Sequence, residues 1–228
     1  MKLPFTFLDV ITKIDGKNTP SLLSPVFMPP ANATIDNGVF AGSRNGTTGT
    51  LYFQQFDAKE QRYVIKEKSL ASLKTTAKAV GKTDDSKQNP NLVAFFDGTY
   101  RWIAYQTRDD TIMIRFLDCS DRDEVEGSEN LCTSHISRLA AVKVVTPSGV
   151  NRIYIYFTNI VNEVYRTFSD VKGGSLNFPQ ADVLDQGLKL NAFSQMSIVP
   201  DAANQQNIIY TISDGGSGIE RITDAWAA

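Results

Sequence analysis

The sequence predicts an all-β fold assembled from a repeated unit of about fifty residues. Four short runs rich in aromatic and β-branched residues return along the 228-residue chain. Aligning one tyrosine in each run gives spacings of 53, 51 and 54 residues; the tyrosines are Tyr52, Tyr105, Tyr156 and Tyr210. Such residues favour β-strands because they pack well on a pleated, half-buried surface. The regular return of one strand pattern therefore predicts a single domain made of similar small sheets.

Each run is the first strand of a predicted hairpin. A polar turn follows the run, and a second β-rich run follows the turn. The predicted first strands are residues 49–53, 102–106, 154–157 and 208–212. The predicted second strands are residues 62–65, 112–116, 164–168 and 219–222.

A third predicted strand precedes each hairpin. These runs are more continuously apolar and contain small residues, as expected for strands that are covered on both faces near an axis. They are residues 39–42, 91–96, 139–145 and 193–199. One small sheet cannot cover both of its faces, whereas several sheets packed radially cover one another. The sequence thus predicts a β-propeller of four blades, or of five, made of antiparallel strands.

The repeats divide residues 1–228 into segments of approximately 21–75, 76–130, 131–180 and 181–228. Residues 3–11 are predicted to form a strand that closes the ring beside the last repeat. A β-sandwich also contains short strands, but it does not predict the same three-strand order in each repeat. Residues 69–80 are the best helical alternative, because their apolar residues fall near helical spacing.

Composition excludes several classes of protein. The net charge of −2 and the pI of about 5.5 argue against a nucleic-acid binder that relies on a large basic face. No apolar run approaches the roughly 20 residues of a membrane span, so no membrane insertion is expected. Cys119, Cys132 and the single histidine, His135, are too few for an ordinary zinc site. Residues 118–126 are acidic but lack the spacing of a calcium loop, so neither a metal nor a cofactor is predicted.

The N-terminal residues lack the uninterrupted apolar core of a signal peptide. We therefore expect either a leaderless cytoplasmic protein or a secreted one whose leader has been removed. The two cysteines are bridged in an oxidising compartment and reduced otherwise, and the sequence leaves both states open.

Several segments repeat a common order of motifs. A small-residue strand is found at 137–142 (SRLAAV), an aromatic strand at 101–106 (RWIAYQ) and at 154–157 (YIYF), and a Gly-Ile-Glu run at 218–220 is followed by Trp226. Together these motifs resemble the blades of the fungal fucose-specific lectins of the orange-peel-fungus type. The resemblance implies a propeller fold, with sugar sites between blades that each use an arginine, a glutamate and an aromatic residue.

The match to that trio of residues is uneven. Arg101 and Arg152 lie one or two residues before the position that the resemblance gives to the arginine, and an offset of one residue turns a strand side chain to the other face. Arg166 takes the glutamate position in the third repeat, while Glu220 lies one residue early in the fourth. Trp226 matches the aromatic position. The arginine position itself is filled by Thr50, Trp102, Tyr154 and Ile208.

A sugar site needs a flat aromatic face and a few planar hydrogen-bonding groups. The candidate ligand-binding residues are Arg101, Trp102, Arg152, Tyr154, Glu163, Glu220 and Trp226. The alternative for the charged members is a solvated strand residue or a surface ion pair. The alternative for the aromatic members is a place in the core, where the four aligned tyrosines are expected.

The leading hypothesis is a lectin-like protein that binds glycans or glycoproteins, fucosylated ones among them, at shallow sites between blades and without catalysis. One alternative is a propeller that serves as a protein-interaction scaffold and lacks sugar binding. The other is a small glycoside hydrolase, which needs two carboxylates close together. No spacing singles out such a pair, so no catalytic residue is predicted. A homo-oligomer is a further option.

Overall fold

The computed structural model describes residues 40–227, apart from 46–47, 73–75, 82, 84–85, 88–90, 97–99, 118–137, 160, 173–175, 180, 185–187, 192–193 and 217. The described chain forms four small antiparallel sheets and one 3-10 turn, η1 (Leu70–Ser72). The all-β fold predicted from the sequence is therefore confirmed.

Each sheet is a meander of strands that are consecutive in the chain. The first sheet contains β1 (Phe40–Asn45), β2 (Thr48–Asp57), β3 (Arg62–Ser69) and β4 (Lys78–Ala79). The second contains β5 (Leu92–Phe96), β6 (Arg101–Gln106) and β7 (Ile112–Phe116). The third contains β8 (Leu139–Val145), β9 (Asn151–Thr158), β10 (Val164–Asp170) and β11 (Asp182–Val183). The fourth contains β12 (Ser197–Asp201), β13 (Gln206–Thr211) and β14 (Glu220–Ala225).

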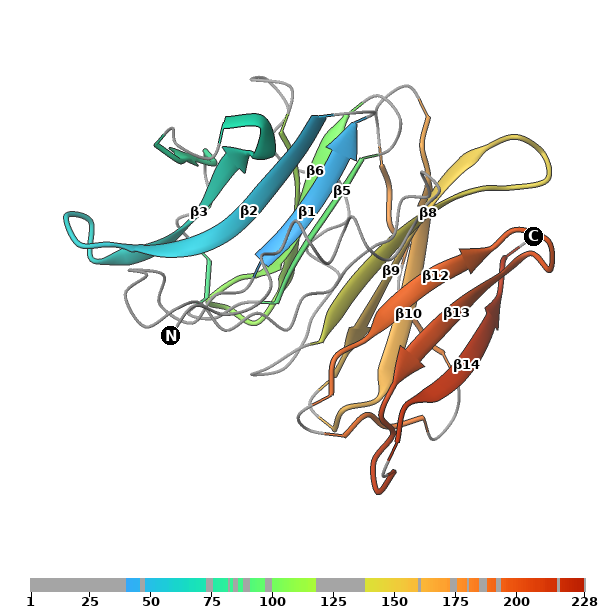
Figure 1. The fold of residues 1–228 in the computed structure, drawn as a ribbon. Coiled ribbons are helices and arrows are strands. Elements are labelled where there is room, and N and C mark those ends of the chain that lie inside the picture. The colour runs from blue at the N-terminus through green and yellow to red at the C-terminus, as the bar shows by residue number, and fades with distance from the viewer. Residues whose placement is uncertain are drawn as a thin grey trace, which may run out of the picture.

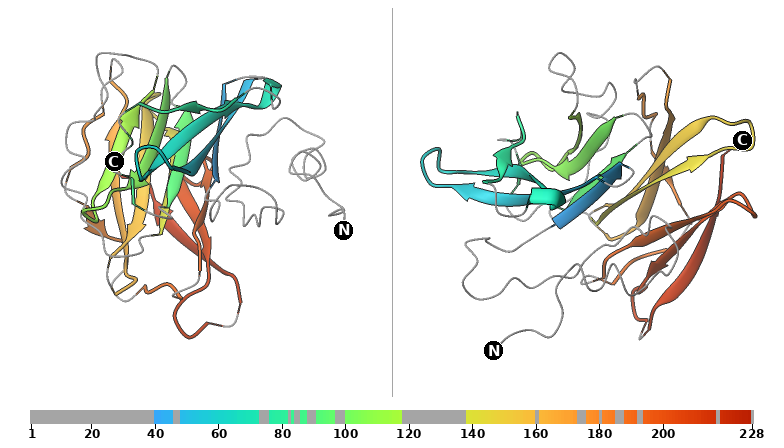
Figure 2. Two further views of the ribbon diagram at one scale, coloured as in Figure 1. Left: turned by 90° about the vertical axis from the view of Figure 1, so that its left-hand side faces the viewer. Right: turned by 45° about the horizontal axis from the view of Figure 1, so that its top comes forward.

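The four sheets pack side by side through their faces, as successive propeller blades do. Their first strands contact one another in order, β1 with β5, β5 with β8, and β8 with β12. Figures 1 and 2 show the first sheet at one end of this series and the fourth sheet at the other. Among the described elements no contact of comparable extent joins β12 to β1. Closure of the ring stays a prediction, and residues 3–11, assigned to it above, lie outside the described residues.

The predicted three-strand order is present in each sheet, with a preceding strand and a hairpin. Among the described residues of 69–80, the helical alternative is realised only as the short turn η1, and Lys78–Ala79 instead pairs with β3 as the outer strand β4. Cys119, Cys132, His135 and the acidic residues 118–126 lie outside the described residues.

Three apolar clusters fill the three interfaces between neighbouring sheets. The first interface contains Tyr52, Ile65, Ile103 and Tyr105 among its buried residues. The second contains Phe95, Trp102, Ile153 and Phe157. The third contains Tyr154, Tyr156, Met196 and Ile209. Because strand side chains alternate, β6 and β9 each supply residues to two interfaces, and burial is almost continuous along both strands.

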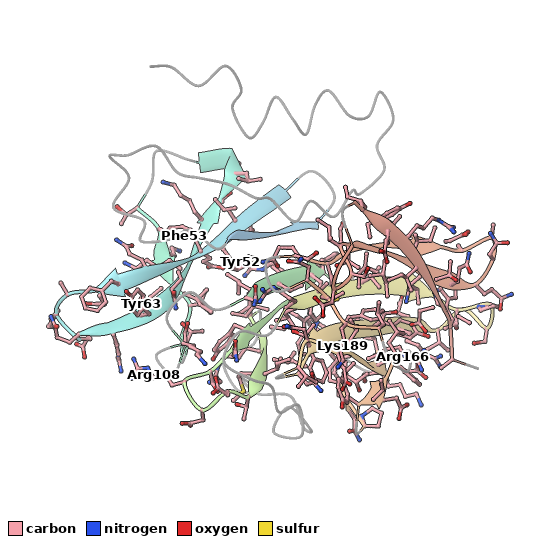
Figure 3. The ribbon with its side chains drawn as sticks, turned by 90° about the horizontal axis from the view of Figure 1, so that it is seen from below. Tyr52, Phe53, Tyr63, Arg108, Arg166 and Lys189 are labelled. Atoms are coloured by element: carbon pink, nitrogen blue, oxygen red, sulfur yellow. The ribbon has the colours of Figure 1, made fainter. Side chains whose placement is uncertain are left out.

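Tyrosine hydroxyl groups link neighbouring sheets across these interfaces. Tyr52 lies on the side of β2 that faces the second sheet (Figure 3), where its hydroxyl accepts a hydrogen bond of 3.3 Å from Arg101 Nη1. At the third interface the hydroxyl of Tyr156 donates to Asp224 Oδ2 at 2.6 Å and accepts from Asn207 Nδ2 at 2.7 Å. Buried polar groups cost free energy unless they are hydrogen-bonded, so these contacts fix which sheets can pack together.

Asp224 is a buried carboxylate with two partners from the third sheet. Besides the Tyr156 hydroxyl, it accepts a hydrogen bond from Arg166 Nη1 at 2.5 Å. Burial raises the pKa of Asp224, although both partners act to lower it. Burial is the main cause that raises the pKa of Tyr156, and the charge of Asp224 adds to it. The hydroxyl therefore stays protonated and donates a hydrogen bond to the carboxylate.

We expect the Trp102→Ala variant to lose about 3–5 kcal/mol of unfolding free energy, because the deleted ring leaves a cavity in the second interface. Trp102 is 1% exposed and its ring is stacked on that of Phe95, with 6.3 Å between centroids. Denaturant unfolding followed by circular dichroism measures the loss. The Ile219→Ala variant is the control, since Ile219 is 77% exposed. A loss for Trp102→Ala as small as that of the control would contradict the assignment to the core.

The raised pKa of Asp224 predicts a specific pH dependence. A carboxyl group that holds its proton more tightly in the folded state stabilises the fold at low pH, and this contribution is lost as pH rises above the ordinary aspartate pKa of 3.8. The Asp224→Asn variant lacks this titration. Its unfolding free energy, relative to that of the parent, should therefore rise as the pH increases above about 4. Parallel stability curves for the two proteins would show that Asp224 has an ordinary pKa.

Candidate functional site

An arginine and an aspartate face each other at the edge of the third interface. Arg152 lies near the start of β9 and Asp170 at the end of β10, and the antiparallel register places their Cα atoms opposite each other. Arg152 Nε donates a hydrogen bond of 2.6 Å to Asp170 Oδ1. This bond is the main cause that raises the pKa of Arg152.

Aromatic rings support this pair. The guanidinium carbon of Arg152 lies 4.6 Å from the centroid of the Phe168 ring, a cation–π distance. Phe168 in turn packs against Tyr154, with 5.4 Å between ring centroids. The side chains of Arg152, Tyr154 and Phe168 share the face of the third sheet that meets the fourth, because they alternate along β9 and β10.

The residues that follow β14 complete the site from the fourth sheet. The backbone of Ala227 donates from its N–H to the Tyr154 hydroxyl at 2.9 Å, and its carbonyl accepts a hydrogen bond from Arg152 Nη1. Trp226 packs against the same interface, and its Nε1 donates to Asn207 Oδ1 at 2.9 Å. We call the set of Arg152, Phe168, Asp170, Trp226 and Ala227 the Arg152 site.

The Arg152 site reaches the surface through its carboxylate. The Asp170 side chain is 25% exposed, whereas that of Arg152 is 9% exposed. A planar donor and a planar acceptor held side by side match the geometry of two neighbouring hydroxyl groups. The site can therefore hold a small polar ligand beside aromatic rings.

The first interface contains a second arginine–carboxylate pair. Arg101 Nη1 donates to Glu67 Oε2 at 3.0 Å and to the Tyr52 hydroxyl at 3.3 Å. Both charged side chains are 27% exposed, so this pair also reaches the surface. Arg101 points back to the sheet before its own, whereas Arg152 points forward to the sheet after its own. Two of the three interfaces thus combine an arginine, a carboxylate and an aromatic residue.

The structure brings together three of the sequence-predicted residues, namely Arg152, Tyr154 and Trp226. Tyr154 is fully buried, so it supports the site through its hydroxyl and presents no ring face to a ligand. Arg101 lies at the first interface, as described above. Trp102 is enclosed in the second interface and likewise presents no face to a ligand.

Glu163 and Glu220 lie away from both pairs. Glu163 closes the β9–β10 hairpin, where its Oε2 accepts a hydrogen bond of 2.9 Å from Asn159 Nδ2. Glu220 begins β14 at an exposed position and accepts a hydrogen bond from the hydroxyl of Ser213. Among the described residues no group of three or more histidine, cysteine, aspartate or glutamate side chains could hold a metal ion.

Sequence reasoning missed Asp170 and Phe168. A signal was present, because the polar turn that follows residues 154–157 was predicted at residues 159–162, and a turn fixes the register of its hairpin. With that register, Asp170 falls directly opposite Arg152, and Phe168 opposite Tyr154. The pairing of Arg166 with Asp224 gave no such signal, because it joins strands of two different sheets, 58 residues apart in the chain. Figure 3 shows Arg166 on the third sheet.

Comparisons with known proteins show the fold. No protein-family model and no curated protein sequence matches the chain. Among solved structures, AofleA from Arthrobotrys oligospora superposes with a TM-score of 0.59 and 8% identity over 85% of this chain. A variant of AofleA with three arginines replaced by alanine gives a TM-score of 0.55 and 16% identity over 86% of this chain. Each match spans 59% of the AofleA chain.

A more distant likeness is to the fucose-specific lectin from Aleuria aurantia, with a TM-score of 0.39 and 11% identity, covering 84% of this chain and 65% of the lectin. No helix of the described chain is long and apolar enough to cross a membrane. The comparisons thus agree with the fold that the sequence predicts, a set of small antiparallel sheets of the kind found in AofleA.

Proposed function

We propose that this chain is a carbohydrate-binding, lectin-like protein that holds a glycan at the Arg152 site without catalysing a reaction. The observation that carries the proposal is the pair of Arg152 and Asp170, seated on the Phe168 ring with the Asp170 side chain 25% exposed. Fucosylated glycans are the first candidates, because the repeat resembles the fungal fucose-specific lectins.

The charges at the third interface favour a neutral ligand. Arg152 and Arg166 are each bonded to one carboxylate, Asp170 and Asp224 respectively, so the positive and negative charges balance. A phosphate or another anion would meet no uncompensated cation at this place, whereas a saccharide needs directional hydrogen bonds and an apolar surface. The chemistry of the site therefore suits a sugar hydroxyl pair better than an anion.

The likeness in fold supports the same assignment. The arginines replaced in the AofleA variant recur at equal intervals along that chain. Arg101 and Arg152 are likewise separated by one repeat, and each is bonded to a carboxylate beside an aromatic residue. We infer that the Arg101 pair with Glu67 is a second, weaker sugar site, because the Tyr52 hydroxyl already occupies part of its guanidinium.

A protein-interaction scaffold is the second candidate function. It is favoured by the hydrogen bond between Arg152 Nη1 and the Ala227 carbonyl, which uses the arginine to hold the end of the fourth sheet in place. In that case Arg152 is structural, and no saccharide competes for it.

The test is glycan-array screening of the full chain, followed by calorimetric titration of the best saccharide and of fucose. We expect the Asp170→Asn variant to bind about ten- to a hundredfold more weakly, because it loses one charge-assisted hydrogen bond worth about 1.5–3 kcal/mol. The change keeps the shape of the side chain and leaves the backbone contacts of Ala227 in place.

The matched control is Asp214→Asn, since Asp214 is an exposed aspartate in the turn before β14. Circular dichroism should show that both variants are folded. The proposal fails if no glycan binds the parent protein above background, or if Asp170→Asn binds as tightly as the control. Binding that is lost in Arg101→Lys but kept in Asp170→Asn would move the principal site to the first interface.

A further inference from the structure

The guanidinium group of Arg152 is covered, although the site that it belongs to reaches the surface. The Arg152 side chain is 9% exposed, against 25% for the side chain of Asp170. The Phe168 ring lies against the guanidinium, Asp170 accepts the bond from Nε, and the Ala227 carbonyl accepts the bond from Nη1. A ligand can therefore contact Asp170 directly, but the Nη1 hydrogen that points to Ala227 becomes available only when Ala227 moves.

The three covering groups differ in how firmly the backbone holds them. Phe168 and Asp170 belong to β10, and the ladder with β9 runs through both residues. The ladder of β14 with β13 ends at Ala225, and one further backbone hydrogen bond is donated by the Trp226 N–H. In the described part of the chain, both backbone hydrogen bonds of Ala227 go to side chains of the third sheet. Ala227 can thus leave the site without breaking a strand pairing.

Trp226 is the fixed point next to Ala227. Its side chain packs against the third interface, and its Nε1 donates to Asn207 Oδ1 at 2.9 Å. Asn207 is fully buried, and its Nδ2 donates in turn to the Tyr156 hydroxyl at 2.7 Å. Rotation of the backbone after Trp226 therefore moves Ala227 away from Arg152 and leaves the interface packed.

The backbone of Ala227 makes contacts that hydroxyl groups of a saccharide can make in its place. Its carbonyl accepts from Arg152 Nη1, and its N–H donates to the Tyr154 hydroxyl at 2.9 Å. A hydroxyl group both accepts and donates hydrogen bonds, so neighbouring hydroxyls can take over both contacts. A further hydroxyl can donate to the exposed carboxylate of Asp170. Such an exchange leaves no buried polar group without a partner, which is the condition for it to cost little free energy.

We propose that Ala227 is a strap that closes the Arg152 site, and that a glycan gains Arg152 by displacing it. The identity of the ligand rests on the proposed function, whereas the closing and opening of the strap do not require a ligand. Two hydrogen bonds favour the closed state by roughly tenfold or more. A ligand that needs the open state has its affinity reduced by the open fraction. The strap thus selects ligands that replace both of its hydrogen bonds.

Chemical modification of Arg152 by phenylglyoxal tests the strap without any ligand, because this reagent attacks the terminal nitrogens of arginine. The Ala227→Pro variant excludes the closed state, since a ring carbon replaces the hydrogen that points to the Tyr154 hydroxyl. We expect Arg152 in this variant to be modified about tenfold faster than in the parent. Peptide mass spectrometry gives this rate, and that of the exposed Arg108 should stay the same.

The matched control is Ala58→Pro, which places the same substitution in the exposed turn between β2 and β3. It should leave the modification of Arg152 at the rate of the parent. Circular dichroism shows whether the variants are folded. Ala227→Gly is the second variant, for use if Ala227→Pro does not fold. It keeps both hydrogen bonds but gives the open strap more conformational freedom, so Arg152 should be modified about two- to fivefold faster.

Calorimetric titration with the saccharide selected by the glycan array tests displacement. We expect Ala227→Pro to bind it about tenfold more tightly than the parent and Ala58→Pro do. Equal modification of Arg152 in Ala227→Pro and Ala58→Pro overturns the strap. Faster modification together with equal or weaker saccharide binding by Ala227→Pro overturns displacement by the glycan. Faster modification with no saccharide bound by any of the proteins supports the strap and refutes the proposed function instead.

Discussion

A three- or four-stranded sheet in this chain has two faces that bear apolar residues, and the structure depends on covering both of them. The second and third sheets meet this requirement with a neighbour on each side, which is why β6 and β9 are buried along almost their whole lengths. A two-layer arrangement would leave one face of each sheet in water. Radial packing is the solution that lets every interior sheet share both faces, and it confines exposure to the ends of the series.

The same packing decides where polar chemistry can occur. Inside an interface a polar group must find a partner on the facing sheet, as Tyr156 does with Asp224 and Asn207. At the rim, a charged side chain can be partly satisfied by the protein and still reach solvent. The arginine–carboxylate pairs of the first and third interfaces lie at such positions, supported by aromatic residues that belong to the core. Aromatic residues of the core therefore support these charged pairs, and the position of the pairs at the rim exposes them to solvent.

Local reasoning succeeded for the hairpins because their strands are adjacent in sequence and their turns fix the register. It also placed Tyr52, Tyr105 and Tyr156 in the core, where all three are fully buried. Alignment of the repeats did not show that Tyr105 faces the preceding sheet while Tyr52 and Tyr156 face the following one. An offset of a single residue turns a strand side chain to the other face of the sheet. The aligned strands consist of similar aromatic and β-branched residues, so a one-residue error in their alignment is not visible in the sequence. Trp102 was a ligand candidate because it lies beside Arg101 in the sequence, and that prediction was wrong, since Trp102 is enclosed in the second interface.

By itself, the sequence determined the secondary structure, the number of repeats in the described chain and the aromatic character of the core, because these depend on residue types at short spacing. The register that pairs Arg152 with Asp170 was also contained in it. Only the tertiary structure decided which arginines meet carboxylates across sheets, that Glu163 and Glu220 lie apart from them, and that Tyr210 stays exposed. Those outcomes depend on which sheet covers which face. The local sequence around two residues more than fifty positions apart does not show whether their sheets will be neighbours.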